Sequence, residues 1–234
     1  MGKDFWLLLL GASMLVGCQS YETDALLTSE VNLEHFPYNR NGVHVVKHQD
    51  VTPVADVPGL SIVNTYYVNL GKPLSVRGYE MQRHEIEVQD TVVWSLQPSS
   101  SNARMDWVLP VQEGFAQENY LGMNNSDYGG GIPVLDIWQR DGGVAVGLIE
   151  PVLRMISMPV EWKRYDNKVH FGLRYMFPEV IEWGTGDTLT TYTSFRYEHK
   201  GDFFNTLRTW SEYMQQNLGI TMQPSEDEAF EPVW

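Results

Sequence analysis

The stretch "IPVLDIWQRDGGVAVGLIE" (residues 132–150) has two apolar arms separated by polar and small residues. The "DGG" at residues 141–143 consists of residue types that tolerate a positive φ, so the stretch predicts a β-hairpin. A second stretch, "ISMPVEWKRYDNKVHFGLRYMF" (residues 156–177), has the same organisation, with the turn expected at residues 166–167. Two successive hairpins favour a chain built on antiparallel pairing.

Other segments on both sides of these hairpins also alternate apolar and polar residues with a period of two. They are rich in β-branched and aromatic residues, which is typical of strands. These segments are "LSIVNTYYVNL" (60–70), "LSVRGYEMQ" (74–82), "HEIEVQDTVVWSL" (84–96), "MDWVLPV" (105–111) and "TLTTYTSFRY" (188–197). The strand pattern therefore extends over most of residues 42–200, which we predict to form one β-sandwich domain.

One segment, "DFFNTLRTWSEYMQQNLG" (residues 202–219), is helical in its pattern. Its apolar residues recur at spacings of four, three, four and four, which places them on one face: Phe203, Leu207, Trp210, Met214 and Leu218. Asp202 is a suitable N-cap and Gly219 a suitable C-cap. The partner of this apolar face is either the sandwich or a further domain.

Composition limits the classes of function. The 234 residues carry a formal net charge of −14, whereas a nucleic-acid-binding domain is expected to present a basic face. An acidic chain is compatible with a neutral ligand such as a sugar, although solubility alone also explains the charge. We therefore expect no nucleic acid partner.

The N-terminus, "MGKDFWLLLLGASMLVGCQS" (residues 1–20), has the features of a bacterial signal peptide. Lys3 precedes a short apolar run at residues 5–10, which is shorter than a transmembrane helix requires. The Leu-Val-Gly-Cys at residues 15–18 resembles the lipobox, at which the chain is cleaved before a cysteine that then carries lipid. Cys18 is the one cysteine of the chain, so it has no disulfide partner within it.

This motif predicts a signal peptide over residues 1–17 and a polar tether over residues 18–41. The protein is then expected to be exported and anchored to a lipid bilayer of the bacterial cell envelope through acylated Cys18. Gln19, directly after the cysteine, favours the outer membrane. The alternative is an ordinary secretory signal with an incidental cysteine.

Motifs for familiar catalytic chemistry are missing from the sequence. It has no H-E-x-x-H, C-x-x-C or G-x-S-x-G pattern, so we expect no metal site, no cofactor and no serine nucleophile. Glycoside hydrolysis needs two carboxylates at a defined separation, which a sequence cannot reveal. "EWKRYD" (residues 161–166) is superficially similar to a sugar-hydrolase W-K-x-D pattern, but we expect Asp166 to serve a turn. We assign no catalytic residue.

A candidate binding segment lies in "QENYLGMNNSDYGGGIPVLDIW" (residues 117–138). It gathers amides, a carboxylate and an aromatic ring, which suit the hydroxyls and the C–H face of a sugar. The residues predicted to bind substrate are Asn124, Asn125, Asp127 and Tyr128. The alternative is a polar surface loop with a glycine bulge. The tryptophans in or beside strands are expected to lie mostly in the core: Trp94, Trp107, Trp138, Trp162 and Trp183.

The segment "NNSDYGGGIPVLDIWQRDGGVAVGLIEPVLRMISMPV" (residues 124–160), the second hairpin, the helix and the final "AFEPVW" (residues 229–234) together resemble a known family. They are similar to the N-terminal β-supersandwich of bacterial α-galactosidase-like glycoside hydrolases, the melibiase group of family 36. The resemblance implies a mainly β fold: a large antiparallel β-supersandwich with one C-terminal linker helix. In that family a (β/α)8 barrel follows and carries both catalytic aspartates.

The resemblance implies that residues 201–234 comprise the linker helix and the start of a barrel that this chain lacks. The chain is then the non-catalytic domain of an exported enzyme, inactive as a fragment, and a galactoside-like substrate binds through the missing barrel. In such enzymes a loop of the sandwich can reach the sugar pocket, and residues 124–128 are the matching segment. Two alternatives remain: a stand-alone carbohydrate-binding envelope lipoprotein, and a structural envelope lipoprotein without a ligand.

Overall fold

Strands dominate the part of the chain that the structure describes. This computed structural model describes residues 21–22, 44–98, 108–121, 132–151 and 154–220. The elements in chain order are β1 (Tyr21–Glu22), β2 (Val45–Pro53), β3 (Leu60–Asn69), β4 (Leu74–Glu87), β5 (Val93–Leu96), β6 (Val108–Val111), β7 (Ala116–Leu121), β8 (Val134–Gln139), β9 (Gly142–Leu148), β10 (Ile156–Glu161), β11 (Lys168–Trp183), β12 (Thr188–Thr190), β13 (Ser194–His199) and α1 (Phe203–Leu218).

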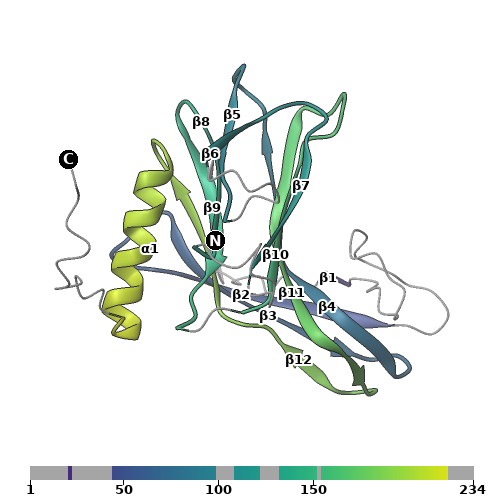
Figure 1. The fold of residues 1–234 in the computed structure, drawn as a ribbon. Helices are drawn as coiled ribbons and strands as arrows, with labels where there is room; N and C mark the ends of the chain where they lie inside the picture. Colours follow the sequence, from purple (N-terminus) through teal and green to yellow (C-terminus); the bar gives the residue numbers. More distant parts are fainter. Residues whose placement is uncertain (1–20, 23–43, 99–107, 122–131, 152–153, 221–234) are drawn as a thin grey trace, which may run out of the picture.

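The strands form two antiparallel sheets that face each other (Figure 1). The larger sheet has the order β1-β2-β3-β13-β9-β8-β5-β6, with β12 also paired to β3, and the smaller has the order β4-β11-β10-β7. The buried core between them takes residues from alternate positions of both sheets, such as Tyr67, Ile137 and Leu148 from the larger and Met158 and Leu173 from the smaller. The predicted antiparallel β-sandwich is therefore confirmed.

Helix α1 packs on the outer face of the larger sheet, on the side away from the smaller sheet (Figure 1). Its Phe203, Leu207 and Trp210 lie against a cluster that includes Trp138 and Phe195. The predicted caps are both present: the Asp202 side chain accepts a hydrogen bond from Phe204 N, and Gly219 has a φ of 63°. The sandwich itself thus supplies a partner for most of the predicted apolar face, while Leu218 stays 39% exposed.

A buried polar anchor joins the helix to the sandwich. Thr206 Oγ1 donates to Asp136 Oδ2 at 2.7 Å, and His199 Nε2 lies 2.9 Å from Asp136 Oδ1. The side chains of Asp136 and His199 have no exposed surface. Trp210 Nε1 adds a hydrogen bond to Leu148 O at 3.0 Å. A buried carboxylate must have such partners, so β8, β13 and α1 are held in one arrangement.

The structure differs from the predicted elements in several details. The segment 188–197 is two strands, because Thr191 leaves the ladder and exchanges hydrogen bonds with Thr65 through its backbone N–H and its hydroxyl. The second hairpin turns over residues 162–167 rather than at two residues, with Tyr165 at a φ of 64°. Residues 74–87 form one strand with two irregularities in its pairing to β11.

The first hairpin turns one residue earlier than predicted. Gln139 pairs with Gly142, so Arg140 and Asp141 form the turn. Gly142 has a φ of 143°, and a Cβ at this position would collide with the carbonyl oxygen of His199. A glycine is needed there because of this close approach as well as because of the turn.

Replacing Thr206 by valine tests the buried anchor. Thr206→Val keeps the shape of the side chain but leaves one Asp136 oxygen without its hydrogen bond, so we expect the free energy of unfolding to fall by about 1–3 kcal/mol. Thr188→Val, at an exposed position of β12, is the matched control and should change it by less than about 0.5 kcal/mol. Urea titration measures both; equal effects of the two substitutions would contradict a stabilising anchor.

The pH dependence of stability should report on His84. Burial lowers the pKa of His84 to about 4, with the charges of Arg196 and Lys47 as further causes. The imidazole binds a proton at about pH 6.5 in the unfolded chain but only at about pH 4 in the folded chain. The free energy of unfolding therefore falls by up to about 3 kcal/mol as the pH falls from about 6.5 to about 4. His84→Gln should flatten the loss of stability between pH 6.5 and pH 4 in urea titrations, and an unchanged slope would refute the assignment.

Candidate functional site

The residues predicted to bind substrate lie outside the described residues. Asn124, Asn125, Asp127 and Tyr128 belong to residues 122–131, and Cys18 to residues 1–20. The ends of the neighbouring strands are described: β7 ends in the smaller sheet and β8 begins in the larger sheet. The chain therefore passes from one sheet to the other where the predicted residues lie.

Several other strand ends meet at this end of the sandwich. Leu121 pairs with Ile156, where β10 begins, and Ser194, where β13 begins, pairs with Leu148, where β9 ends. We call this the loop end and define it by Leu121, Val134, Leu148, Ile156 and Ser194. The strands β3, β4 and β11 are longer and extend past the loop end. The loop end therefore lies beside the extended part of these three strands (Figure 1).

An aromatic cluster lies beside the loop end. The Tyr175 ring contacts those of Tyr79, Phe177 and Tyr192 at centroid separations of 5.3, 5.0 and 4.9 Å, and the Tyr175 and Tyr192 hydroxyls are 3.5 Å apart. The Arg154 guanidinium lies over the Tyr192 ring, 4.5 Å from its centroid. Tilted and edge-to-face ring contacts and a cation over a ring favour a fixed arrangement of these side chains.

Burial shifts the pKa values of the phenols beside the loop end. Burial and the hydrogen bond with Tyr192 raise the pKa of Tyr175 to about 12, and burial also raises the pKa of Tyr79. Both phenols therefore stay protonated at neutral pH. Glu150 Oε1 accepts a hydrogen bond from Thr193 N at 3.0 Å, so this carboxylate shapes the backbone. Arg154 Nε is buried without a hydrogen-bond partner among the described residues.

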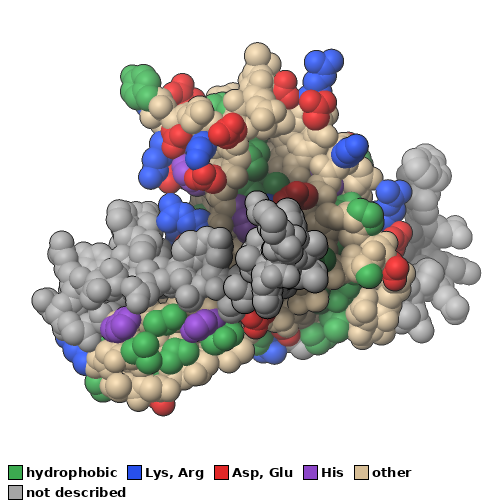
Figure 2. Space-filling model, turned by 180° about the vertical axis from the view of Figure 1, so that it is seen from behind, with side chains coloured by type: hydrophobic (Ala, Val, Ile, Leu, Met, Phe, Trp, Pro, Cys, Tyr) green, Lys and Arg blue, Asp and Glu red, His purple; other side chains and the backbone are tan. Residues whose placement is uncertain are grey.

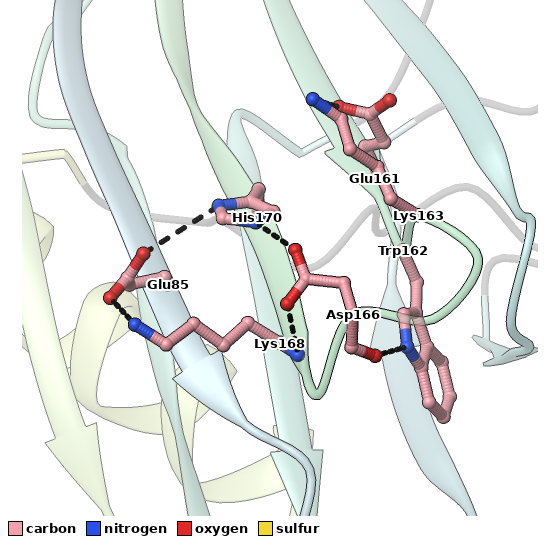
Figure 3. A network of polar contacts seen from close by, with 7 residues as sticks. All are labelled: Glu85, Glu161, Trp162, Lys163, Asp166, Lys168 and His170. Atoms are coloured by element: carbon pink, nitrogen blue, oxygen red, sulfur yellow. Dashed lines mark hydrogen bonds and ion pairs between the residues drawn. The ribbon is translucent and has the colours of Figure 1, made fainter.

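The W-K-x-D pattern forms a turn, as predicted (Figure 3). Asp166 Oδ1 accepts from Lys168 N at 3.2 Å, and Trp162 Nε1 donates to Asp166 O at 2.8 Å. His170 Nε2 lies 3.0 Å from Asp166 Oδ2, and this hydrogen bond lowers the pKa of Asp166. A carboxyl group with a lowered pKa is ionised at neutral pH and cannot serve as a general acid.

The same network pairs charges along the outer side of the smaller sheet. Lys168 forms an ion pair with Glu85, and the hydrogen bond from Lys168 lowers the pKa of Glu85. Figure 2 shows acidic and basic side chains mixed over the face of the molecule that lies behind the view of Figure 1. Side chains of both charges therefore lie on this face.

The tryptophans differ in their exposure. Trp138 and Trp183 are buried, as predicted for core residues, and Trp162 is half-buried. Trp94 is the exception at 40% exposed, and Trp107 lies outside the described residues. Most of the described strand tryptophans are therefore in or against the core, as predicted, and Trp94 is not among them. The alternation of side chains along β5 places Trp94 on the outer face of the larger sheet, which also carries α1. The helix does not cover Trp94.

Metal ligands and membrane-spanning helices can be assessed for the described residues. Among them, no group of three or more His, Cys, Asp or Glu side chains is arranged to hold a metal ion. Within the same residues, no helix has the length and apolar content needed to cross a bilayer.

Comparisons with known proteins point to one group. No protein-family model matches the chain. Over 113 residues the chain is 30% identical to an "A type blood alpha-D-galactosamine galactosaminidase" of Flavonifractor plautii, a match that covers 48% of this chain and 10% of that protein. The chain therefore spans about a tenth of its curated relative.

Solved structures show the same fold at low sequence identity. The galactosidase domain of the alpha-galactosidase-sucrose kinase AgaSK matches with a TM-score of 0.52 and 13% identity, over 75% of this chain and 25% of that chain. A second match is AgaA of Geobacillus stearothermophilus, a family 36 alpha-galactosidase solved in complex with stachyose. It has a TM-score of 0.54 and 11% identity, over 74% of this chain and 24% of that chain. The alpha-galactosidase of Lactobacillus brevis matches with a TM-score of 0.52 and 11% identity, over 74% of this chain and 25% of that chain.

A double-mutant cycle tests the contact that fixes the loop end. Arg154→Met and Tyr192→Leu each remove one side of the cation–π pair, so we expect a coupling of about 0.5–2 kcal/mol in the free energy of unfolding. Arg77→Met, at an exposed position on β4, should show no coupling to Tyr192→Leu. Urea titration of the single and double variants measures both couplings, and equal values would argue against the pair.

Proposed function

We propose, from a fold shared with family 36 alpha-galactosidases, that the chain is the N-terminal, non-catalytic domain of an exported glycoside hydrolase that acts on α-galactosides. The observation that carries the proposal is the agreement of two independent likenesses. The fold matches part of several alpha-galactosidases, and the sequence matches part of a galactosaminidase. Both kinds of relative are named for cleaving galactose-type sugars.

Three carboxylates of the described residues are held in structural contacts. Hydrolysis needs two carboxyl groups that face one glycosidic bond, one of them able to donate a proton. Asp136 is fully buried against Thr206 and His199, and Asp166 is ionised within a turn. Glu118 accepts from Ser157 Oγ and pairs with Arg174. On this proposal the reacting carboxylates belong to the rest of the enzyme.

The contribution of this domain to the substrate would come from the loop end. The predicted residues, Asn124, Asn125, Asp127 and Tyr128, follow β7 and precede β8 in the sequence. The described end of β7, Leu121, pairs with Ile156, which in turn pairs with Tyr175 of the aromatic cluster. A rigid scaffold beneath a polar loop is the usual arrangement for ligand contacts. We propose that this loop contributes hydrogen bonds to a galactoside held mainly by the catalytic domain.

The enzyme assay that tests the proposal compares two forms of the protein. The 234-residue chain should not hydrolyse p-nitrophenyl α-galactoside, whereas the protein encoded by the complete gene, read beyond the codon for Trp234, should do so. In that longer protein Asp127→Ala should raise KM with a smaller effect on kcat, since it removes a binding contact. Hydrolysis by the chain alone, or a gene that ends at this codon, would overturn the proposal.

The proposed location rests on the lipobox-like residues 15–18. When the gene is expressed in a bacterial host, the wild-type chain should incorporate labelled palmitate and sediment with the membranes. Cys18→Ser should abolish labelling and leave the membrane fraction, and Ser20→Ala is the matched control that should retain both. Labelling that persists in Cys18→Ser would exclude acylation at this residue.

The exposed Trp94 favours a second candidate function, a carbohydrate-binding envelope lipoprotein that acts alone. This candidate predicts sugar binding by the isolated chain and a reading frame that ends at its last codon. The first candidate predicts a frame that continues into a catalytic domain, so the gene sequence separates the two.

A further inference from the structure

An open groove of about 500 Å³ lies at the end of the sandwich opposite the loop end. It is bounded by the turn between β8 and β9, by the connection from β4 to β5, and by the residues at the start of α1. The lining residues that matter here are Asp90, Trp94, Trp138, Gln139, Arg140 and Asp202. The volume is within the range of small-molecule sites, roughly 300–1,000 Å³.

Two tryptophans form the apolar part of the groove. Trp94 and Trp138 are paired across β5 and β8, so their side chains lie on the same face of the larger sheet. Trp138 is 7% exposed and packs against Phe203 at a centroid separation of 5.5 Å, which fixes its position. Trp94 is 40% exposed. A large apolar side chain next to a buried one thus remains open to solvent within the groove.

The polar rim is held in place by hydrogen bonds to the backbone. Gln139 Oε1 accepts from Gln89 N at 2.7 Å and from Asp90 N at 3.0 Å, and Gln139 Nε2 donates to Glu87 O at 2.8 Å. Asp90 Oδ2 accepts from Arg140 N at 2.9 Å. A rim that is ordered without a ligand has little conformational entropy to lose on binding.

Unused hydrogen-bonding capacity remains on this rim. Each of Asp90 and Asp202 uses one carboxylate oxygen within the described part of the chain, for Arg140 N and Phe204 N respectively. The Arg140 guanidinium makes no hydrogen bond or ion pair with other described residues. The groove therefore offers acceptors, a five-donor cation and an aromatic surface side by side.

These features select a class of ligand. Two carboxylates against one guanidinium disfavour phosphates and other anions, and the polar rim disfavours a purely apolar ligand. A pyranose has an apolar C–H face for Trp94 and hydroxyls that both accept from Arg140 and donate to Asp90 and Asp202. We propose that this groove binds a neutral pyranose unit of a glycan, as a site separate from the predicted loop of residues 124–128.

The test uses the chain labelled with nitrogen-15 and titrated with methyl α-galactopyranoside, methyl α-glucopyranoside and methyl β-N-acetylglucosaminide. At least one sugar should shift the Trp94 indole N–H and the Gln139 side-chain amide, with a dissociation constant on the order of 1–10 mM for a single ring. Absence of shifts at these groups with all three sugars would overturn the proposal.

Single substitutions in the groove test which side chains hold the sugar. Trp94→Ala and Arg140→Ala should each weaken binding about tenfold or more, since each removes a side chain facing the groove. Arg140→Ala keeps the backbone N–H that Asp90 uses, so it tests the groove even if Trp94→Ala disturbs folding. Tyr165→Ala, at a 96% exposed aromatic residue outside the groove, is the control and should leave the affinity unchanged.

The result also distinguishes this site from the one in the proposed function. Shifts confined to residues 122–131, lost in Asp127→Ala and retained in Trp94→Ala, would overturn the groove proposal and leave the proposed function intact. Shifts at Trp94 that are retained in Asp127→Ala would support the groove whatever the activity of the complete enzyme.

Discussion

The arrangement of this domain depends on one buried carboxylate. Asp136 lies in the middle of β8, and its two oxygens are used by Thr206 of α1 and by His199 at the end of β13. Removing one of these partners leaves a buried carboxyl oxygen without its hydrogen bond, which costs about 1–3 kcal/mol, so the geometry of all three elements is coupled to this residue. The helix is consequently part of the sandwich. It forms a third layer on the larger sheet rather than a hinge that moves against it.

The same anchor brings together the segments that line the groove at the end of the sandwich opposite the loop end. His199 precedes the residues that lead into α1, and its carbonyl oxygen lies so close to Gly142 that no Cβ fits there. This close approach brings the β8–β9 turn and the N-terminus of α1 together. Arg140 and Asp202, from segments far apart in the sequence, thereby line one groove. The lining of the groove is thus a consequence of packing in the core beneath it.

The sequence predicted what is local. The limits and caps of α1 follow from Asp202, from Gly219 and from the 3.6-residue period between them, and the first hairpin follows from its glycines and alternation. The break between β12 and β13 was missed because it results from hydrogen bonds between Thr191 and Thr65, which no local pattern encodes. The division of the strands between two sheets likewise depends on long-range pairing.

Prediction of the candidate sites was also limited by contacts between segments that are distant in the sequence. Residue types singled out residues 124–128, but the cluster of Tyr79, Tyr175 and Tyr192 arises from three separate segments that only the fold brings together. The sequence does not show which strand tryptophan is exposed, because alternation identifies a face of the sheet and not what covers it. Helix α1 lies chiefly over β8 and β13, so the same outer face is buried at Trp138 and open at Trp94. Exposure of Trp94 is therefore decided by where the distant helix α1 begins. This helix starts at Phe203 beside Trp138 of β8 and leaves Trp94 of the neighbouring β5 open to solvent.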